Sequence, residues 1–171
     1  MKLLREINDK DAGTGAEERF DKPYQLRKAV RAVLLNDKQQ VALINVSKNK
    51  YHKLPGGGVD EGESLEQALK REVMEEVGYE MELKEGIGVI VEYRNDNDRL
   101  QISYCYIADV TGGDGVNNLE QDEIDDGFQT MWVDIDEAIK LLEQDKPEEY
   151  NGKFIVIRDL AIIKEAKQIL G

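Results

Sequence analysis

Apolar and polar positions along the chain follow two different periods. Five runs are rich in β-branched and aromatic residues and are bounded by turn residues, which predicts strands. These runs cover residues 25–35, 40–46, 86–93, 100–110 and 128–133. Asn36-Asp37-Lys38 predicts the turn that separates the first two strands.

One stretch between these strands has helical spacing and clear signals at both ends. Ser64 is a favourable N-cap residue, and Gln67 is placed to complete a capping box. Gly78 supplies the left-handed residue that ends a helix. The apolar residues of this stretch recur on one face, as expected for a stripe that packs against a core. They are Leu65, Ala68, Leu69, Val73 and Val77.

Two further helices are predicted near the end of the chain. Asp134 with Glu137 forms a second capping-box pattern, for a helix that runs to about residue 144. Pro147 interrupts the chain, and residues 153–170 have a helical apolar pattern. Strands and helices therefore mix without strict alternation, which argues against a purely parallel, doubly wound sheet.

The helix that follows Ser64 carries an unusual group of carboxylates. Glu72, Glu75 and Glu76 fall within an arc of roughly 100° on one face, and like charges at this spacing repel. The arc overlaps the edge of the apolar stripe, so these side chains are expected to face inward, where a carboxylate needs a cation. Divalent ions such as Mg²⁺ take oxygen ligands of this kind. The alternative is a Glu-rich helix on the protein surface.

A glycine loop that contains Gly56, Gly57 and Gly58 precedes this helix. Loop and helix, residues 54–79, together resemble the Nudix box, G-x5-E-x7-R-E-U-x-E-E-x-G-U, in which U is a bulky apolar residue. Gly57, Glu63 and the run 71–79 match every polar and glycine position. Tyr79 departs from the aliphatic residue that is usual there, at a position that packs rather than reacts. The resemblance implies an α/β (α+β) fold with a mixed β-sheet sandwiched between helices.

The resemblance also implies a function. Family members hydrolyse a nucleoside diphosphate linked to another group, using Mg²⁺ or Mn²⁺. By this resemblance the metal ligands are Gly56 (through its carbonyl), Glu72, Glu75 and Glu76, and Glu63 with Arg71 forms a pair that orients them.

The general base is left open between two groups of glutamates. Glu75 or Glu76 within the box is one choice. Related subfamilies use a glutamate from a loop after the box instead, for which Glu120 and Glu123 are the candidates. Both lie in the acidic, glycine-rich segment 111–127, which we predict to be a loop over one end of the sheet.

Length and charge limit the class of protein. A chain of 171 residues is expected to form a single domain, residues 1–171, in which residues 1–24 supply an N-terminal strand and connector. A net charge of −13 argues against a nucleic-acid polymer as partner and requires local basic residues or metal ions to bind an anionic substrate.

The single cysteine, Cys105, excludes a disulfide framework. Without a membrane-length apolar segment or signal region, a cytoplasmic protein is expected.

Other residues have weaker signals. His52 is more readily explained as a structural, hydrogen-bonded residue than as a substrate contact, and Lys53, Arg94 and Arg99 are candidate phosphate contacts. Cys105 and Trp132 are expected in the core.

The substrate is left open by the sequence. ADP-ribose pyrophosphatases tend to have a proline downstream of the box, whereas residues 56–146 of this chain contain none. Dinucleoside polyphosphate hydrolases tend to have a tyrosine slightly further on, and Tyr93 lies too early in the chain for that position. A modified nucleoside triphosphate, a nucleotide sugar or another nucleoside diphosphate derivative remains. The alternative function is a non-catalytic, nucleotide-binding or regulatory module of the same fold. Whether the protein forms a homodimer is also left open.

Overall fold

The fold is built on one mixed sheet, described here from a computed structural model in which residues 1–16 and 23–171 are placed. The predicted connector 1–24 lies partly outside these residues, at positions 17–22. The strands are β1 (Leu3–Ile7), β2 (Gln25–Leu35), β3 (Val41–Val46), β4 (Tyr51–Lys53), β5 (Tyr79–Arg94), β6 (Arg99–Gly113) and β7 (Phe128–Val133). The helices are α1 (Asp9–Ala12), α2 (Leu65–Val77), α3 (Gln121–Asp125), α4 (Ile135–Gln144) and α5 (Tyr150–Leu170), with a 3-10 turn η1 (Asn95–Asn97).

The strands pair in the order β1-β5-β6-β2-β3-β4, and β7 also pairs with β3. The β1–β5 and β2–β6 pairs are parallel, and the other pairs are antiparallel. The sheet is therefore mixed, as predicted. The β2–β6 register runs unbroken from Gln25 opposite Arg99 to Leu35 opposite Asp109, which fixes the side chains of both strands relative to each other.

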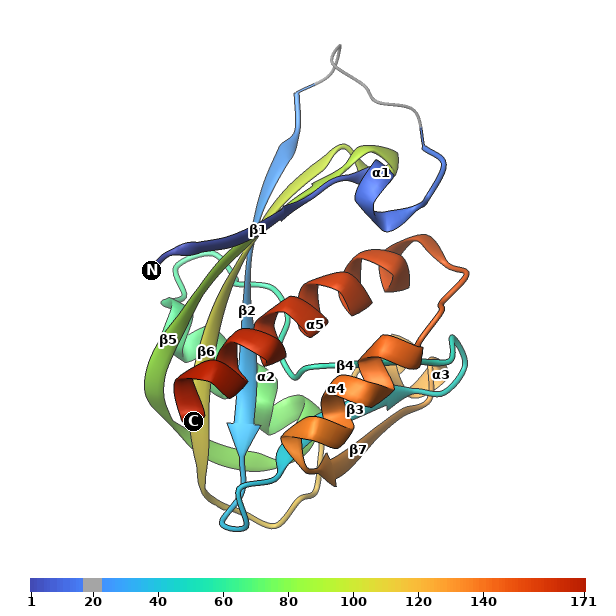
Figure 1. Ribbon diagram of the computed structural model, residues 1–171. Coiled ribbons are helices and arrows are strands. Elements are labelled where there is room, and N and C mark those ends of the chain that lie inside the picture. The colour runs from blue at the N-terminus through green and yellow to red at the C-terminus, as the bar shows by residue number, and fades with distance from the viewer. Residues whose placement is uncertain (17–22) are drawn as a thin grey trace.

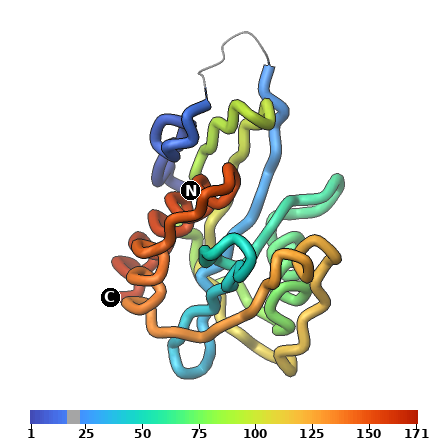
Figure 2. The backbone as a smooth tube through the Cα atoms, turned by 90° about the vertical axis from the view of Figure 1, so that its right-hand side faces the viewer, coloured from blue at the N-terminus to red at the C-terminus, as the bar shows by residue number. Residues whose placement is uncertain are grey.

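Helices cover both faces of the sheet. On one face α4 and α5 bury Leu142, Phe154 and Ile162 against Leu43 and Ile107. On the other face α2 buries its apolar stripe against β2 and β6. Figure 1 shows α5 lying across the sheet with α2 behind it, and the turned view in Figure 2 shows α4 and α5 on one side of the strands and α2 on the other. The predicted fold class is confirmed.

Local signals placed the box helix correctly. Ser64 Oγ accepts from the Gln67 backbone N–H at 3.2 Å, and Gln67 Oε1 accepts from the Ser64 N–H at 2.9 Å. Gly78 has φ of 79° and ends the helix. The second predicted capping box is wrong, because Asp134 caps α4 without a side-chain hydrogen bond.

Several predicted boundaries needed correction. The strand expected at 86–93 begins at Tyr79. Its first part was overlooked although three apolar residues, Tyr79, Met81 and Leu83, alternate with polar ones. The segment 111–127 contains the end of β6 and the short helix α3. Strand β3 begins at Val41 and α5 at Tyr150, and neither α1 nor β4 had been expected. None of the helices in the described part of the chain is long and apolar enough to cross a membrane.

Candidate active site

The glycine loop lies along β2 and is fixed to it by backbone hydrogen bonds. Val30 N–H donates to the Gly57 carbonyl and Ala32 N–H to the Pro55 carbonyl, each at 3.0 Å. Gly56 has φ of +129°, and a Cβ there would lie 2.2 Å from the Val30 carbonyl oxygen. A Cβ on Gly57 would lie 2.4 Å from the Glu72 carboxylate. Glycine is therefore required for this close approach of the loop to strand and helix.

Glu76 is the most buried carboxylate of α2, at 2% exposure. Lys53 Nζ donates to Glu76 Oε1 at 2.6 Å, and the Gly56 N–H donates to Oε2 at 2.7 Å. A buried carboxylate needs such partners to offset the loss of hydration. Glu76 thus joins the glycine loop to α2. Lys53, a candidate phosphate contact in the sequence, pairs with this glutamate and also lines the cavity described below.

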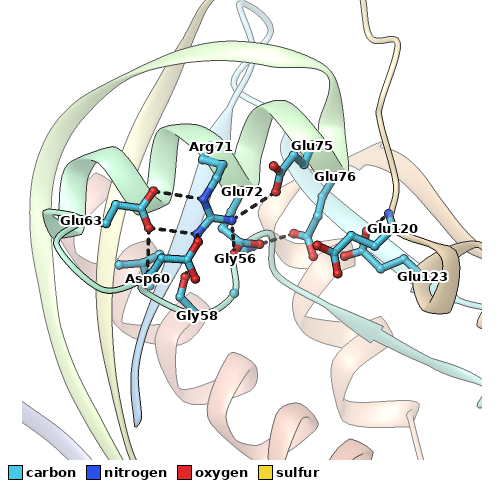
Figure 3. Close-up of polar contacts among 12 residues, drawn as sticks. Gly56, Gly58, Asp60, Glu63, Arg71, Glu72, Glu75, Glu76, Glu120 and Glu123 are labelled. Carbon is cyan, nitrogen blue, oxygen red and sulfur yellow. Dashed lines mark hydrogen bonds and ion pairs between the residues drawn. The ribbon is translucent and has the colours of Figure 1, made fainter.

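Arg71 joins the remaining box carboxylates (Figure 3). Its Nε and Nη2 atoms donate to the two carboxylate oxygens of Glu63, both at 3.0 Å, and Nη2 also donates to the Gly58 carbonyl at 3.0 Å. Nη1 donates to Glu72 at 2.8 Å and to Glu75 at 3.2 Å. The hydrogen bond from Arg71 lowers the pKa of Glu63. One guanidinium therefore sets the positions of three carboxylates, since its donors form a rigid fork.

Glu120 and Glu123 lie at the start of α3, close to the end of Glu76 in Figure 3. Glu123 Oε2 accepts from the Glu120 N–H at 2.8 Å. Burial, and then the charge of Glu76, raise the pKa of Glu123 to about 7. A carboxyl group with this pKa can take up or release a proton near neutral pH.

A cavity of about 370 Å³ brings these groups together. Glu72, Glu75 and Glu76 line it with Glu120 and Glu123, so that the box and the segment after it meet at one place. Gly56, Gly57 and Gly58 line it also. Glu63 does not line the cavity and reaches it only through Arg71.

Sequence reasoning missed three arginines of this cavity, Arg27, Arg31 and Arg158. Arg27 and Arg31 are four residues apart, on the same face of β2, and Arg31 interrupts an apolar run, a signal that was available in QLRKAVRAVLL. Arg158 is fully buried in α5 and had no signal except a charge on an apolar helix face. Arg94 and Arg99, which the sequence had singled out, do line the cavity.

The remaining candidates lie elsewhere. His52 Nδ1 is 3.0 Å from Asp145 Oδ2, and the same carboxylate accepts from the His52 N–H, which is a structural arrangement. Cys105 is buried. Trp132 is partly buried and packs edge-on against Tyr79, at 5.7 Å between ring centroids.

The carboxylate oxygens of Glu72, Glu75 and Glu76 are ligands of the kind that a hard divalent ion prefers. Burial, and then the charge of Glu76, raise the pKa of Glu72, so these carboxylates crowd one another in the absence of a further cation. Among the described residues no three acidic, histidine or cysteine side chains form a ready-made metal cage. Mg²⁺ usually binds through one or two carboxylates together with substrate phosphates, so the residues present fit such an ion. The four predicted ligands stay a prediction.

Fold and site together define a class of protein, the hydrolases that act on phosphorus anhydrides. Comparison with known sequences gives the family: the NUDIX domain matches residues 25–154, and the chain belongs to this family. Members of the family generally use divalent metal ions.

Relatives with assigned activities differ in what they act on. A Bacillus subtilis (strain 168) protein provisionally named 8-oxo-dGTP diphosphatase is 36% identical over 81 residues, 47% of this chain and 52% of that protein. The chain thus spans about half the length of this relative. Mouse diphosphoinositol polyphosphate phosphohydrolase 3-alpha is 28% identical over 130 residues, 73% of this chain and 74% of that protein.

A solved structure supports the fold independently. The NUDIX hydrolase from Nitrosomonas europaea superposes with a TM-score of 0.65 over 86% of this chain and 90% of that one, at 20% identity. At this identity the likeness concerns the fold alone.

Proposed function

We propose that the protein hydrolyses the diphosphate linkage of a small nucleoside diphosphate derivative, with Mg²⁺ or Mn²⁺ as cofactor. The observation that carries the proposal is Arg71, which joins Glu63, Glu72 and Glu75 beside the glycine-lined cavity. A surface helix would gain nothing from this arrangement, because it concentrates negative charge beside a cavity. An anionic substrate can enter such a cavity only together with a cation.

In this proposal Glu72, Glu75 and Glu76, with the Gly56 carbonyl, hold the metal. The bound cation would screen the charge of the diphosphate and make an attacking water more acidic. Glu63 and Arg71 do not touch the substrate and act by orienting Glu72 and Glu75. The glycine loop lets the phosphates approach the backbone.

Glu123 is the best-supported general base of the four candidates. Its pKa of about 7 suits proton transfer at neutral pH, and it lines the cavity. Glu76 is held by Lys53 and the Gly56 N–H, and Glu75 by Arg71, so both already have fixed partners. In the proposed reaction Glu123 takes the proton of the water while the leaving phosphate departs in line.

Phosphate release from a panel of diphosphates in the presence of Mg²⁺ tests the proposal. The panel includes 8-oxo-dGTP and a diphosphoinositol polyphosphate, the compound types in the names of the relatives, beside nucleotide sugars. Glu75→Gln is expected to lower the rate on the order of 100-fold or more, because it removes a ligand of the metal. Glu66→Gln, an exposed position on the same helix, serves as the matched control. The absence of turnover on every compound would support the alternative, a non-catalytic binding module.

A further inference from the structure

Arginines gather around the cavity that the glutamates of α2 also line. Five of them line it, and we refer to these as the arginine cluster. The cluster consists of Arg27, Arg31, Arg94, Arg99 and Arg158. The chain has 23 basic and 36 acidic residues, so its composition does not lead one to expect five arginines around one cavity. The five residues come from β2, β5, β6 and α5, so only the tertiary structure assembles them.

Strand register accounts for this arrangement. Arg27 of β2 lies opposite Gln101 of β6, which lies opposite Glu92 of β5. Arg94 and Arg99 are likewise paired across β5 and β6. Arg158 reaches these strands from α5, where its Nη1 lies 3.7 Å from Glu92 Oε2. A polar layer thus replaces the apolar contact that would otherwise fill the space between α5 and this end of the sheet.

Three members of the cluster are almost fully buried and incompletely bonded. Arg31, Arg94 and Arg158 are 5%, 4% and 0% exposed. Within the described part of the chain, four of their buried nitrogen atoms have no hydrogen-bond partner: Arg31 Nε, Arg94 Nε and both Nη atoms of Arg158. Buried polar groups without partners are rare and costly, so these atoms point to a ligand.

The charges of the cluster are also incompletely balanced. Two buried carboxylates belong to it: Arg94 Nη2 donates to Glu92 at 2.6 Å, and Arg158 Nε donates to Asp159 at 2.7 Å. Five arginines against two carboxylates leave three positive charges. Burial, and then the charge of Arg158, lower the pKa of Arg31 to about 10, and burial followed by Arg99 lowers the pKa of Arg27.

The glutamates of the cavity offset part of this excess while no metal is bound. Glu76 is paired with Lys53, but Glu72 and Glu75 share the single charge of Arg71 with Glu63. Glu72 is the glutamate whose charge acts on Arg27, and a metal ion on Glu72 would cancel that effect. The arginine cluster therefore needs anionic groups of its own when the glutamates hold metal and diphosphate.

Phosphate is the anion that best suits these donors. Guanidinium forks bind phosphate oxygens in pairs, and a cavity of about 370 Å³ admits a small molecule that carries several such groups. Among the residues that the structure describes, the lining holds a single aromatic one, Phe128, and Lys53 Nζ lies over its ring at 4.7 Å from the centroid. The cavity thus provides many phosphate donors and little aromatic surface for stacking a base.

We propose that the arginine cluster binds phosphate groups of the substrate other than the diphosphate that is hydrolysed. The substrate class is then a small diphosphate whose organic part carries further phosphate esters. This rests on the proposed function for the placement of the hydrolysed diphosphate beside the glutamates of α2, and it extends the substrate class from nucleoside diphosphate derivatives to other small diphosphates. The additional phosphates can belong to a polyol or to the sugar of a nucleoside, and the two sources share the same chemistry.

Calorimetric binding to the metal-free protein tests the proposal without turnover. The probes are inositol hexakisphosphate, adenosine 3′,5′-bisphosphate compared with AMP, and pyrophosphate. Arg27→Gln and Arg99→Gln are each expected to weaken binding about tenfold or more, the value of a charged hydrogen bond. These two arginines are partly exposed, and of them only Arg27 bonds to the buried layer, through Gln101 Oε1 at 2.6 Å. Arg5→Gln, at an exposed arginine of β1, is the matched control and leaves binding unchanged.

The outcomes separate the alternatives. Tight binding of inositol hexakisphosphate, or a preference for the bisphosphate over AMP, supports the proposal and identifies the polyol or the nucleoside as the source. The proposal is overturned if neither probe binds, if Arg27→Gln behaves like Arg5→Gln, or if pyrophosphate alone binds as tightly as the larger probes. In the last case the cluster holds the hydrolysed diphosphate itself. Because no step requires hydrolysis, loss of the proposed activity and loss of this binding are seen separately.

Discussion

The position and the protonation of each glutamate in the site depend mainly on the charged group with which it is paired. Arg71 bonds to Glu63, Glu72 and Glu75 at once, and Lys53 bonds to Glu76. Glu123 lacks a cationic partner of this kind, and burial raises its pKa to about 7. Glutamates that look alike in the sequence thus differ in protonation because of their surroundings.

The pH dependence of the reaction tests the role of Glu123. A base with a raised pKa is protonated below that pKa, so the rate should fall as the pH drops below about 7. A metal ion in the cavity favours the carboxylate and moves the midpoint lower. In Glu123→Gln the acidic limb disappears and kcat falls by about 10²–10⁴. An unchanged acidic limb of the kcat profile in this variant would assign the base elsewhere.

Lys53→Gln tests the buried ion pair. It leaves Glu76 charged and buried without its cation, which should lower the free energy of unfolding by about 3–5 kcal/mol. Lys70→Gln removes an exposed ion pair with Glu66 and should change the free energy of unfolding by less than about 0.5 kcal/mol. Urea unfolding without metal measures both. Equal effects of the two substitutions would mean that the Lys53 pair contributes no more than a surface pair.

At the scale of the elements, local sequence signals placed some boundaries and missed others. The box helix has a bonded cap, an apolar stripe and a terminal glycine, and its bounds were predicted correctly. Helix α3 is five residues long and entirely acidic or polar apart from Ile124, so no stripe marks it. The first half of β5 does carry a strand pattern, since Tyr79, Met81 and Leu83 alternate with polar residues and pack in the core, and it was overlooked.

The two capped helices give a matched pair for measuring a cap. Ser64→Ala removes a side-chain bond to the Gln67 N–H and should lower the free energy of unfolding by about 1 kcal/mol. Asp134→Ala removes no such bond and should cost less. Thermal and urea unfolding of both variants measure the difference. A larger loss in Asp134→Ala would contradict the assignment of the caps.

At the scale of the whole molecule, one cavity collects side chains of both charges. The glutamates arrive from α2 and α3, and the arginines arrive from strands and from α5. Our proposals place a cation on the glutamates and an anion on the arginines. The molecule as a whole should therefore gain stability when either is supplied, because the ligand binds only the folded state.

Mg²⁺ should raise the melting temperature of the protein. At a concentration 100 times the dissociation constant the gain is about 2.7 kcal/mol, or roughly 5–10 °C for a chain of this size. Differential scanning fluorimetry at constant ionic strength measures the shift, with KCl as the control for screening. The shift should shrink in Glu75→Gln and persist in Glu66→Gln. Equal shifts in both variants would show that Mg²⁺ acts on the general acidic surface and not at α2.

The sequence by itself determined the parts of this protein that depend on neighbours along the chain. The box helix, its caps, the glycine loop and the spacing of Glu72, Glu75 and Glu76 are all local, and they sufficed to indicate the family and the reaction. Gly56 and Gly57 were recognised by type, although their reason, contact with Val30 and Glu72, lies in the fold.

Only the tertiary structure decided how distant charges meet. Strand register and the packing of α5 bring Arg27, Arg94 and Arg158 to one cavity, although 131 positions separate the first from the last. Burial raises the pKa of Glu123, and the pairing of Lys53 with Glu76 connects β4 to α2. Such interactions depend on distance in space and on exclusion of water, and neither follows from separation along the chain.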